Sequence, residues 1–218
     1  MGHIQRFRHA MPGAILSLLL ASVLAPSAHA QNDALSLDLN ADAARLAWAH
    51  LIPERQIRVD ASWLHHQDHG NVASAGFHIT GNAATAERPI NAGLGGRVLW
   101  AATEQQNNIP PMLIMTPGAL VIAPVPDEDG AGLAVGGFFD AKIPNYDRIG
   151  FGGHLYFAPD ILAFGDLEQY TELWLYGSYS LLRQGDIYLG VRNVKGDFKR
   201  ASDFNFDTGV HVGFTLKF

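Results

Sequence analysis

The sequence predicts an all-β fold, a transmembrane antiparallel up-and-down β-barrel of about ten strands. Apolar and polar residues alternate in ten separate stretches, which is the period of a strand with two different faces. The connections between these stretches tend to alternate between long and short, as they do in bacterial outer-membrane barrels. The chain also ends in a strand-like segment with a terminal aromatic residue.

The last segment, residues 209–218, shows the alternation most clearly. Its apolar positions are Val210, Val212, Phe214, Leu216 and Phe218. A glycine, spaced hydrophobic residues and a final aromatic residue resemble the C-terminal assembly signal of outer-membrane barrels, which assigns that role to Gly213, Leu216 and Phe218. The period alone fits a strand facing lipid and a strand facing a soluble core.

The other nine predicted strands cover residues 35–40, 45–51, 57–63, 71–80, 94–100, 133–139, 149–157, 172–181 and 186–195. An even number of strands brings both ends of the chain to one side of a membrane. With a periplasmic amino terminus, the longer outward connections are 65–70, 103–130, 158–169 and 196–203. The short inward connections are 52–55, 143–148 and 182–185.

Two connections depart from this alternation, because the first outward one is short and 81–89 is longer than a turn requires. Residues 103–130 are rich in proline, and we expect one long outward loop there. Residues 159–166 are expected to contain a short helical turn, since Pro159 suits the start of a helix.

Residues 1–30 have the pattern of a cleaved secretory signal. Arg6 and Arg8 precede an apolar run from Ala14 to Ala25, and Ala28-His29-Ala30 provides the small residues at which a signal peptidase cuts. The apolar run is too short to span a bilayer. We therefore expect Gln31 to begin a single mature barrel domain, residues 31–218.

Charge and composition exclude several function classes. Without residues 1–30 the chain has 13 Lys and Arg against 21 Asp and Glu, a formal charge of −8, opposite to the balance expected of a nucleic-acid-binding protein. The chain has no cysteine, which excludes disulfides and thiol chemistry. The longest apolar run after residue 30, Met112–Val125, is interrupted by Pro117 and Pro124 and is too short for a spanning helix.

Segments of the second half resemble the YfaZ family of small Gram-negative outer-membrane proteins. They are DRIGFGGHLYFAPD at 147–160 and DIYLGVRNVK at 186–195, and the closing GVHVG at 209–213 is similar too. The resemblance is best over 133–218 and loose over 35–100. It implies an outer-membrane location and a barrel fold, and it carries over no activity.

Seven side chains are candidates to face the lumen of the predicted barrel: His154, Tyr156, Glu172, Arg192, Asp207, His211 and Lys217. A barrel of roughly eight to ten strands has little more interior than its side chains fill. We therefore expect opposite charges to pair and plug the lumen. The alternative is a narrow water-filled path, in which Arg192 and Lys217 favour anions and Glu172 and Asp207 oppose them.

Two clusters have metal-binding residue types without the spacing of a metal site. The first, in the predicted 65–70 loop, consists of His65, His66, Asp68 and His69. Ligands of a structural site are spaced so that the chain can wrap the ion, and these are nearly adjacent. The second, Asp127-Glu128-Asp129, lacks the alternating ligands of a calcium loop. We expect solvated loops at both, with no metal and no cofactor.

An outer-membrane lipid-modifying enzyme, of acyltransferase or deacylase type, is one alternative. Ser178 or Ser180 would be its nucleophile, His154 the base and Glu172 the carboxylate that orients the base. No nucleophile-elbow glycine pattern marks either serine. Another alternative is a soluble periplasmic β-sheet domain that binds a ligand.

The sequence favours an outer-membrane β-barrel with a structural or narrow, porin-like role and no catalysis. Its expected partners are phospholipids and lipopolysaccharide around the barrel and the barrel-assembly machinery at the last strand. Small solutes are candidate partners of the lumen, and nucleic acid is not expected.

Overall fold

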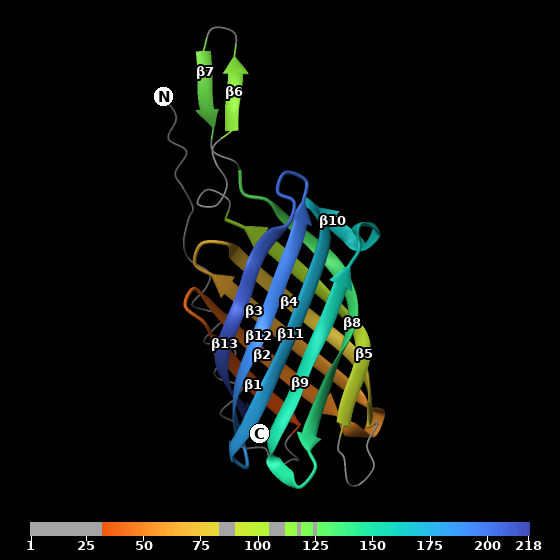
Figure 1. Cartoon of the computed structure of the whole chain (residues 1–218). Helices are drawn as coiled ribbons and strands as arrows, with labels where there is room; N and C mark the ends of the chain where they lie inside the picture. The colour runs from red at the N-terminus through yellow and green to blue at the C-terminus, as the bar shows by residue number, and fades with distance from the viewer. Residues whose placement is uncertain (1–31, 83–89, 105–111, 117–118, 124–125) are drawn as a thin grey trace, which may run out of the picture. The chain divides into compact units, whose positions relative to one another are not determined.

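Ten antiparallel strands form a closed ring (Figure 1). The structure, a computed structural model, describes residues 32–82, 90–104, 112–116, 119–123 and 126–218. The strands of the ring are β1 (Asp33–Leu39), β2 (Ala43–Ile52), β3 (Ile57–His66), β4 (Gly70–Asn82), β5 (Ile90–Thr103), β8 (Asp129–Ile143), β9 (Tyr146–Ala158), β11 (Leu167–Leu182), β12 (Gly185–Phe198) and β13 (Phe204–Lys217). Each overlaps one of the ten predicted segments, and each pairs with the next along the chain. The predicted all-β up-and-down barrel is confirmed.

The ring closes between its first and last strands. Leu35 of β1 lies opposite Leu216 of β13, and Leu39 lies opposite Val212. Asp33 and the terminal Phe218 exchange two backbone hydrogen bonds, of 3.0 and 2.9 Å. Every strand of the ring therefore has two neighbours, so the sheet leaves no free edge.

The outward face of the ring is apolar. Val212 on β13 is 61% exposed, Leu189 on β12 is 61% exposed and Leu94 on β5 is 76% exposed. Exposed large hydrophobic side chains also come from β1, β3, β4, β8, β9 and β11, so they surround the ring as a belt. A soluble protein rarely exposes so large a continuous apolar surface, whereas a membrane barrel presents such a surface to lipid.

The inward face is filled at the end of the ring away from Asp33 and Phe218. Large side chains of the apolar cluster there are Leu64, Val72, Leu99, Leu167, Phe198, Phe204 and Phe206, all at most 7% exposed. Aromatic rings of the cluster pack edge to face, with centroids 5.1 Å apart between Phe204 and Phe206. We call this set the apolar plug.

The connection 103–130 contains structure that the prediction of one long loop omitted. Two short strands, β6 (Met112–Thr116) and β7 (Ala119–Ala123), pair as a hairpin within it. The apolar run at this place is divided by Pro117-Gly118, a turn-forming dipeptide. The run was therefore two strands, not an irregular segment interrupted by a proline.

The predicted polar loop 196–203 is shorter in the structure, because β12 continues to Phe198; β13 begins at Phe204, directly after the predicted loop. The pairing of β12 with β13 shifts register between Val194 and Lys195. As a result Phe206 and Asp207 are both buried, and the alternation of the sequence is lost at this point.

Among the remaining connections, residues 159–166 contain the predicted helical turn as a 3-10 helix, η3 (Asp160–Leu162). It is followed by a short strand, β10 (Ala163–Gly165), which pairs with the start of β8. No helix among the described residues is long and apolar enough to span a membrane. The predicted signal, residues 1–30, and most of the predicted 81–89 connection lie outside the described residues.

Replacing Gly213 by valine should destabilise the barrel by about 1–3 kcal/mol, because a side chain there would overlap the ring of Tyr188 on β12. The matched control is Gly209→Val on the same strand, where a Cβ meets nothing within 4 Å. Urea unfolding in detergent, followed by tryptophan fluorescence, measures the difference. Equal unfolding midpoints for the two variants would contradict the prediction.

Candidate functional site

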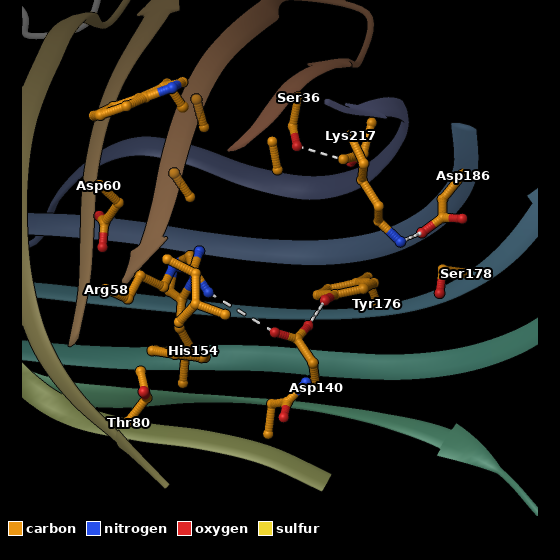
Figure 2. A pocket seen from close by; sticks show the side chains of 18 of the residues that line it. Ser36, Arg58, Asp60, Thr80, Asp140, His154, Tyr176, Ser178, Asp186 and Lys217 are labelled. Atoms are coloured by element: carbon orange, nitrogen blue, oxygen red, sulfur yellow. Dashed lines mark hydrogen bonds and ion pairs between the residues drawn. The ribbon is translucent and has the colours of Figure 1, made fainter. Parts of the chain in front are cut away.

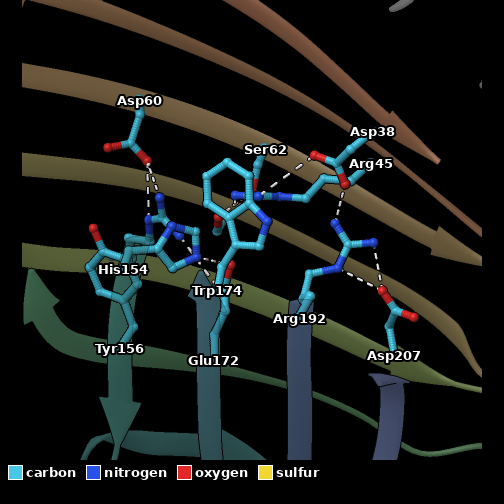
Figure 3. Close-up of polar contacts among 12 residues, drawn as sticks. Asp38, Arg45, Asp60, Ser62, His154, Tyr156, Glu172, Trp174, Arg192 and Asp207 are labelled. Atoms are coloured by element: carbon cyan, nitrogen blue, oxygen red, sulfur yellow. Dashed lines mark hydrogen bonds and ion pairs between the residues drawn. The ribbon is translucent and has the colours of Figure 1, made fainter. Parts of the chain in front are cut away.

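A network of charged side chains crosses the middle of the lumen (Figure 3). Glu172 of β11 is its first centre and is 4% exposed. The guanidinium groups of Arg97 and Arg45 lie 3.3 and 3.6 Å from its carboxylate oxygens. His154 Nε2 is 2.7 Å from Glu172 Oε1, and the hydroxyl of Tyr170 donates to Oε2 at 3.1 Å. One carboxylate thus connects side chains of β2, β5, β9 and β11.

Arg97 extends the network to β3 and β4. Its Nε donates to Asp60 at 3.0 Å, and its guanidinium lies over the ring of Tyr156 at 4.0 Å from the centroid. His78 Nδ1 is 3.0 Å from Asp60, while His78 Nε2 is 2.8 Å from the hydroxyl of Tyr156. Asp60, His78 and Tyr156 therefore each contact two other side chains of the network.

Arg192 of β12 is the second centre. It makes an ion pair with Asp38 of β1, and its Nε donates to Asp207 of β13 at 2.6 Å. The hydroxyl of Tyr188 donates to Asp38 at 3.1 Å. Arg45, 4.0 Å from Asp38, connects the two centres.

The charges of this network nearly balance. Three arginines, Arg45, Arg97 and Arg192, face four carboxylates, Asp38, Asp60, Glu172 and Asp207. Charges buried this deeply persist only when they are paired and hydrogen-bonded. We call these seven residues the charge network. With the apolar plug it fills the lumen from its middle to the end away from the termini.

The seven predicted lumen residues all lie on the inward face of the ring. Six are at most 7% exposed: His154, Tyr156, Glu172, Arg192, Asp207 and His211. His211 accepts a hydrogen bond from the indole N–H of Trp174. Lys217 lies apart from the other six, at the end of the ring near the termini, 2.5 Å from Asp186.

The first half of the chain supplies four partners that the sequence analysis did not single out: Asp38, Arg45, Asp60 and Arg97. A signal for them was present. Asp38 stands between Leu37 and Leu39, and Asp60 stands between apolar neighbours in the same way. A charged residue at the polar phase of an alternating strand is a candidate for the lumen.

The residues of the hypothetical lipid-modifying enzyme do not come together. His154 is bonded to Glu172, as that hypothesis requires. Ser178, however, lies opposite Gly150, whereas His154 lies opposite Trp174. Four positions along β11 amount to roughly 13 Å. Ser180 is farther away still and accepts a hydrogen bond from Lys142 at 3.0 Å.

Two residues of the histidine cluster, His65 and His66, lie on opposite faces of β3. His65 is exposed, while His66 is buried and stacks on His69 with ring centroids 3.9 Å apart. No group of three or more His, Cys, Asp or Glu side chains that could hold a metal ion occurs among the described residues. The expectation of a solvated loop was wrong for His66.

It was also wrong for Glu128, which is 1% exposed. Its carboxylate accepts from the backbone N–H of Arg200 at 3.1 and 3.2 Å. Glu128 therefore connects the end of the 103–130 connection to the loop between β12 and β13.

A cavity of about 530 Å³ occupies the rest of the lumen, between the charge network and the end near the termini (Figure 2). Arg58, Asp140, Lys142, Tyr176, Ser178 and Lys217 are among the residues that line it. It is open to solvent, since the side chains of Lys217 and Asp140 are 34% and 41% exposed. We call this cavity the vestibule.

Comparison with models of protein families assigns the chain to a family. The family described as YfaZ precursor matches residues 95–218, more than half of the sequence. The chain belongs to the YfaZ precursor family. The match to YfaZ includes Arg97, Glu172 and Arg192, whereas Asp38 and Asp60 precede it.

The chain is also similar to two solved structures. One is described as a KdgM porin in complex with disordered oligogalacturonate, with 11% identity, 85% of this chain and 98% of that chain covered, and a TM-score of 0.41. The other, a KdgM porin, has 11% identity, the same coverage and a TM-score of 0.39. None of the curated proteins compared with this YfaZ-family chain matches it.

Replacing Arg192 by methionine should lower the free energy of unfolding by about 3–5 kcal/mol, because it leaves Asp38 and Asp207 buried without their cation. Lys195→Met on the same strand removes an exposed pair with Asp203 and should change it by less than about 1 kcal/mol. Urea unfolding in detergent measures both. Adding Asp38→Asn and Asp207→Asn to Arg192→Met should restore part of the lost free energy of unfolding. If Arg192→Met and Lys195→Met lower this free energy by similar amounts, the argument is refuted.

Proposed function

We propose that this protein is a bacterial outer-membrane β-barrel of porin-like architecture whose role is structural, with a closed lumen and no catalysis. The observation that carries the proposal is the apolar belt around a closed ring with paired charges inside it. In water this arrangement is inside out, because apolar side chains face solvent while ionic groups fill the interior. In a bilayer it places each group in the medium that favours it.

Several partners follow from this placement. Phospholipid and lipopolysaccharide surround the apolar belt. The last strand, with Gly213, Leu216 and Phe218, is recognised by the barrel-assembly machinery. Residues 1–30 direct export and are then removed. The structure of the ring supports the recognition of the last strand, since Leu216 faces outward and Phe218 forms the closing backbone pair with Asp33.

The filled lumen favours a structural role over a conducting one. The apolar plug and the charge network occupy the lumen from its middle to one end. A narrow pore would require the side chains of the apolar plug and of the charge network to move apart. This movement would break the ion pairs of the charge network. Binding at the vestibule needs no such rearrangement.

The two alternatives find less support. A soluble periplasmic domain would leave the apolar belt in water. A lipid-modifying enzyme would need a serine beside His154, and neither Ser178 nor Ser180 is in that place.

The test is to isolate the protein from a Gram-negative host and compare its electrophoretic mobility before and after boiling. We expect it in the outer-membrane fraction, with a folded band that shifts on heating. In a planar bilayer it should show no stable conductance steps, because the lumen is filled.

Recovery in the soluble periplasmic fraction, without a heat-dependent shift, would refute the membrane assignment. Stable conductance steps would refute the closed lumen while leaving the barrel in place. Lipid A extracted from a deletion strain should be unchanged, and an altered acylation pattern would favour the enzyme.

A further inference from the structure

The vestibule contains two cations, Arg58 and Lys142, that are not hydrogen-bonded to any carboxylate of the described residues. We propose that it binds a small water-soluble anion, in which a carboxylate or phosphate group is attached to a ring, and that Arg58 and Lys142 hold the anionic group. The inference rests on the geometry of the vestibule and stands whether or not the lumen conducts.

Arg58 of β3 is positioned but largely unpartnered. Its guanidinium lies over the ring of Phe138, 4.2 Å from the centroid, which fixes the guanidinium plane. The nearest carboxylate among the described residues, Asp140, is 3.8 Å from Nη1, longer than a hydrogen bond. Arg58 Nε is buried without a hydrogen-bond partner. The terminal nitrogens of Arg58 therefore make no hydrogen bond within the described residues and can donate to a carboxylate or phosphate in competition with Asp140.

Lys142 of β8 supplies the second cation. It lies two residues beyond Asp140 on the same face of the strand, about 6.6 Å along it. Its ammonium donates to the hydroxyl of Ser180 at 3.0 Å, and no carboxylate of the described residues lies within ion-pair distance of it. On the neighbouring strand β9, the inward positions 150 and 152 are glycines, so no side chain separates Lys142 from the vestibule wall of β11.

The carboxylates of the vestibule are mostly occupied. Asp186 pairs with Lys217 at 2.5 Å, and Asp60 is held by Arg97 at 2.9 Å and by His78 at 3.0 Å. Asp140, beside Arg58, accepts from the hydroxyl of Tyr176. Among the described residues, Arg58 therefore has one carboxylate within ion-pair distance, Asp140, and Lys142 has none (Figure 2).

The rest of the vestibule suits a ring. Trp174 and Tyr176 line it, together with the hydroxyls of Thr80 and Ser178. Its volume of about 530 Å³ lies within the range of small-molecule sites, roughly 300–1,000 Å³. Inorganic phosphate alone would leave most of that space unfilled, whereas a ring could stack on the indole of Trp174 while its anionic group reaches Arg58.

The experiment is isothermal titration calorimetry of the protein purified in detergent, with phenyl phosphate and benzoate as anionic probes. Phenyl β-glucoside, a neutral compound, and inorganic phosphate serve as controls. We expect saturable binding of at least one anionic probe, weaker binding of inorganic phosphate and no saturable binding of the glucoside. Raising the salt concentration should weaken the binding.

Variants test the residues. Arg58→Gln and Lys142→Gln should each weaken binding by about tenfold or more, since each removes a charge-assisted contact. Asp140→Asn should strengthen it several-fold, because it removes the competing carboxylate. Arg148→Gln is the matched control, since Arg148 is an exposed arginine near the same end of the ring that does not line the vestibule. The heat-dependent gel shift establishes that each variant is folded.

The proposal is overturned if neither anionic probe saturates, if the glucoside binds as well as the anions do, or if Arg58→Gln and Lys142→Gln both bind like the parent protein. A gain in affinity on Asp140→Asn supports it even where Arg58→Gln does not fold. The calorimetry is done in detergent and does not depend on the membrane fractionation or the conductance measurement. A failure of the proposed function in those experiments can therefore be distinguished from a failure of anion binding.

Discussion

The pairing of buried charges is the constraint on which the rest of this structure depends. A closed ring of ten strands leaves a lumen, and this chain fills its middle with arginines and carboxylates that have lost most of their contact with water. Each must therefore find its partner within the protein. The pairs run across the ring, from β1 to β12 and from β2 and β5 to β11, so they also fix the positions of strands that share no backbone hydrogen bonds.

Most of the ring could be predicted because its strands meet two different media. Where one face meets lipid and the other the lumen, as in residues 210–218, hydrophobicity alternates and the strand can be recognised locally. The prediction was incomplete where this contrast is absent. Phe204 and Phe206 point inward into the apolar plug, so the start of β13 lacks polar inward residues, and the clear alternation begins only at residue 209.

The candidate site was predictable only in part, for a different reason. The side chains that face the lumen follow from the strand period, and all seven that were named lie on that face. Their partners do not follow, because the residues that pair are far apart in the chain. Arg192 and Asp38 are separated by 154 positions, and their contact depends on the register of the whole ring. The vestibule depends in addition on where the plug ends, which no local pattern records.

The seam between β1 and β13 also has a consequence for how the barrel forms. Asp38 lies on β1 and the closer of its two cations, Arg192, on β12, so this ion pair forms only when β1 and β13 have met. An open sheet would carry two unpaired backbone edges and, at the same place, a carboxylate that has lost Arg192 and keeps only the longer contact with Arg45. Partly closed states therefore lack both backbone hydrogen bonds and an ion pair, and closure of the ring should be an all-or-none event that requires the last residues of the chain.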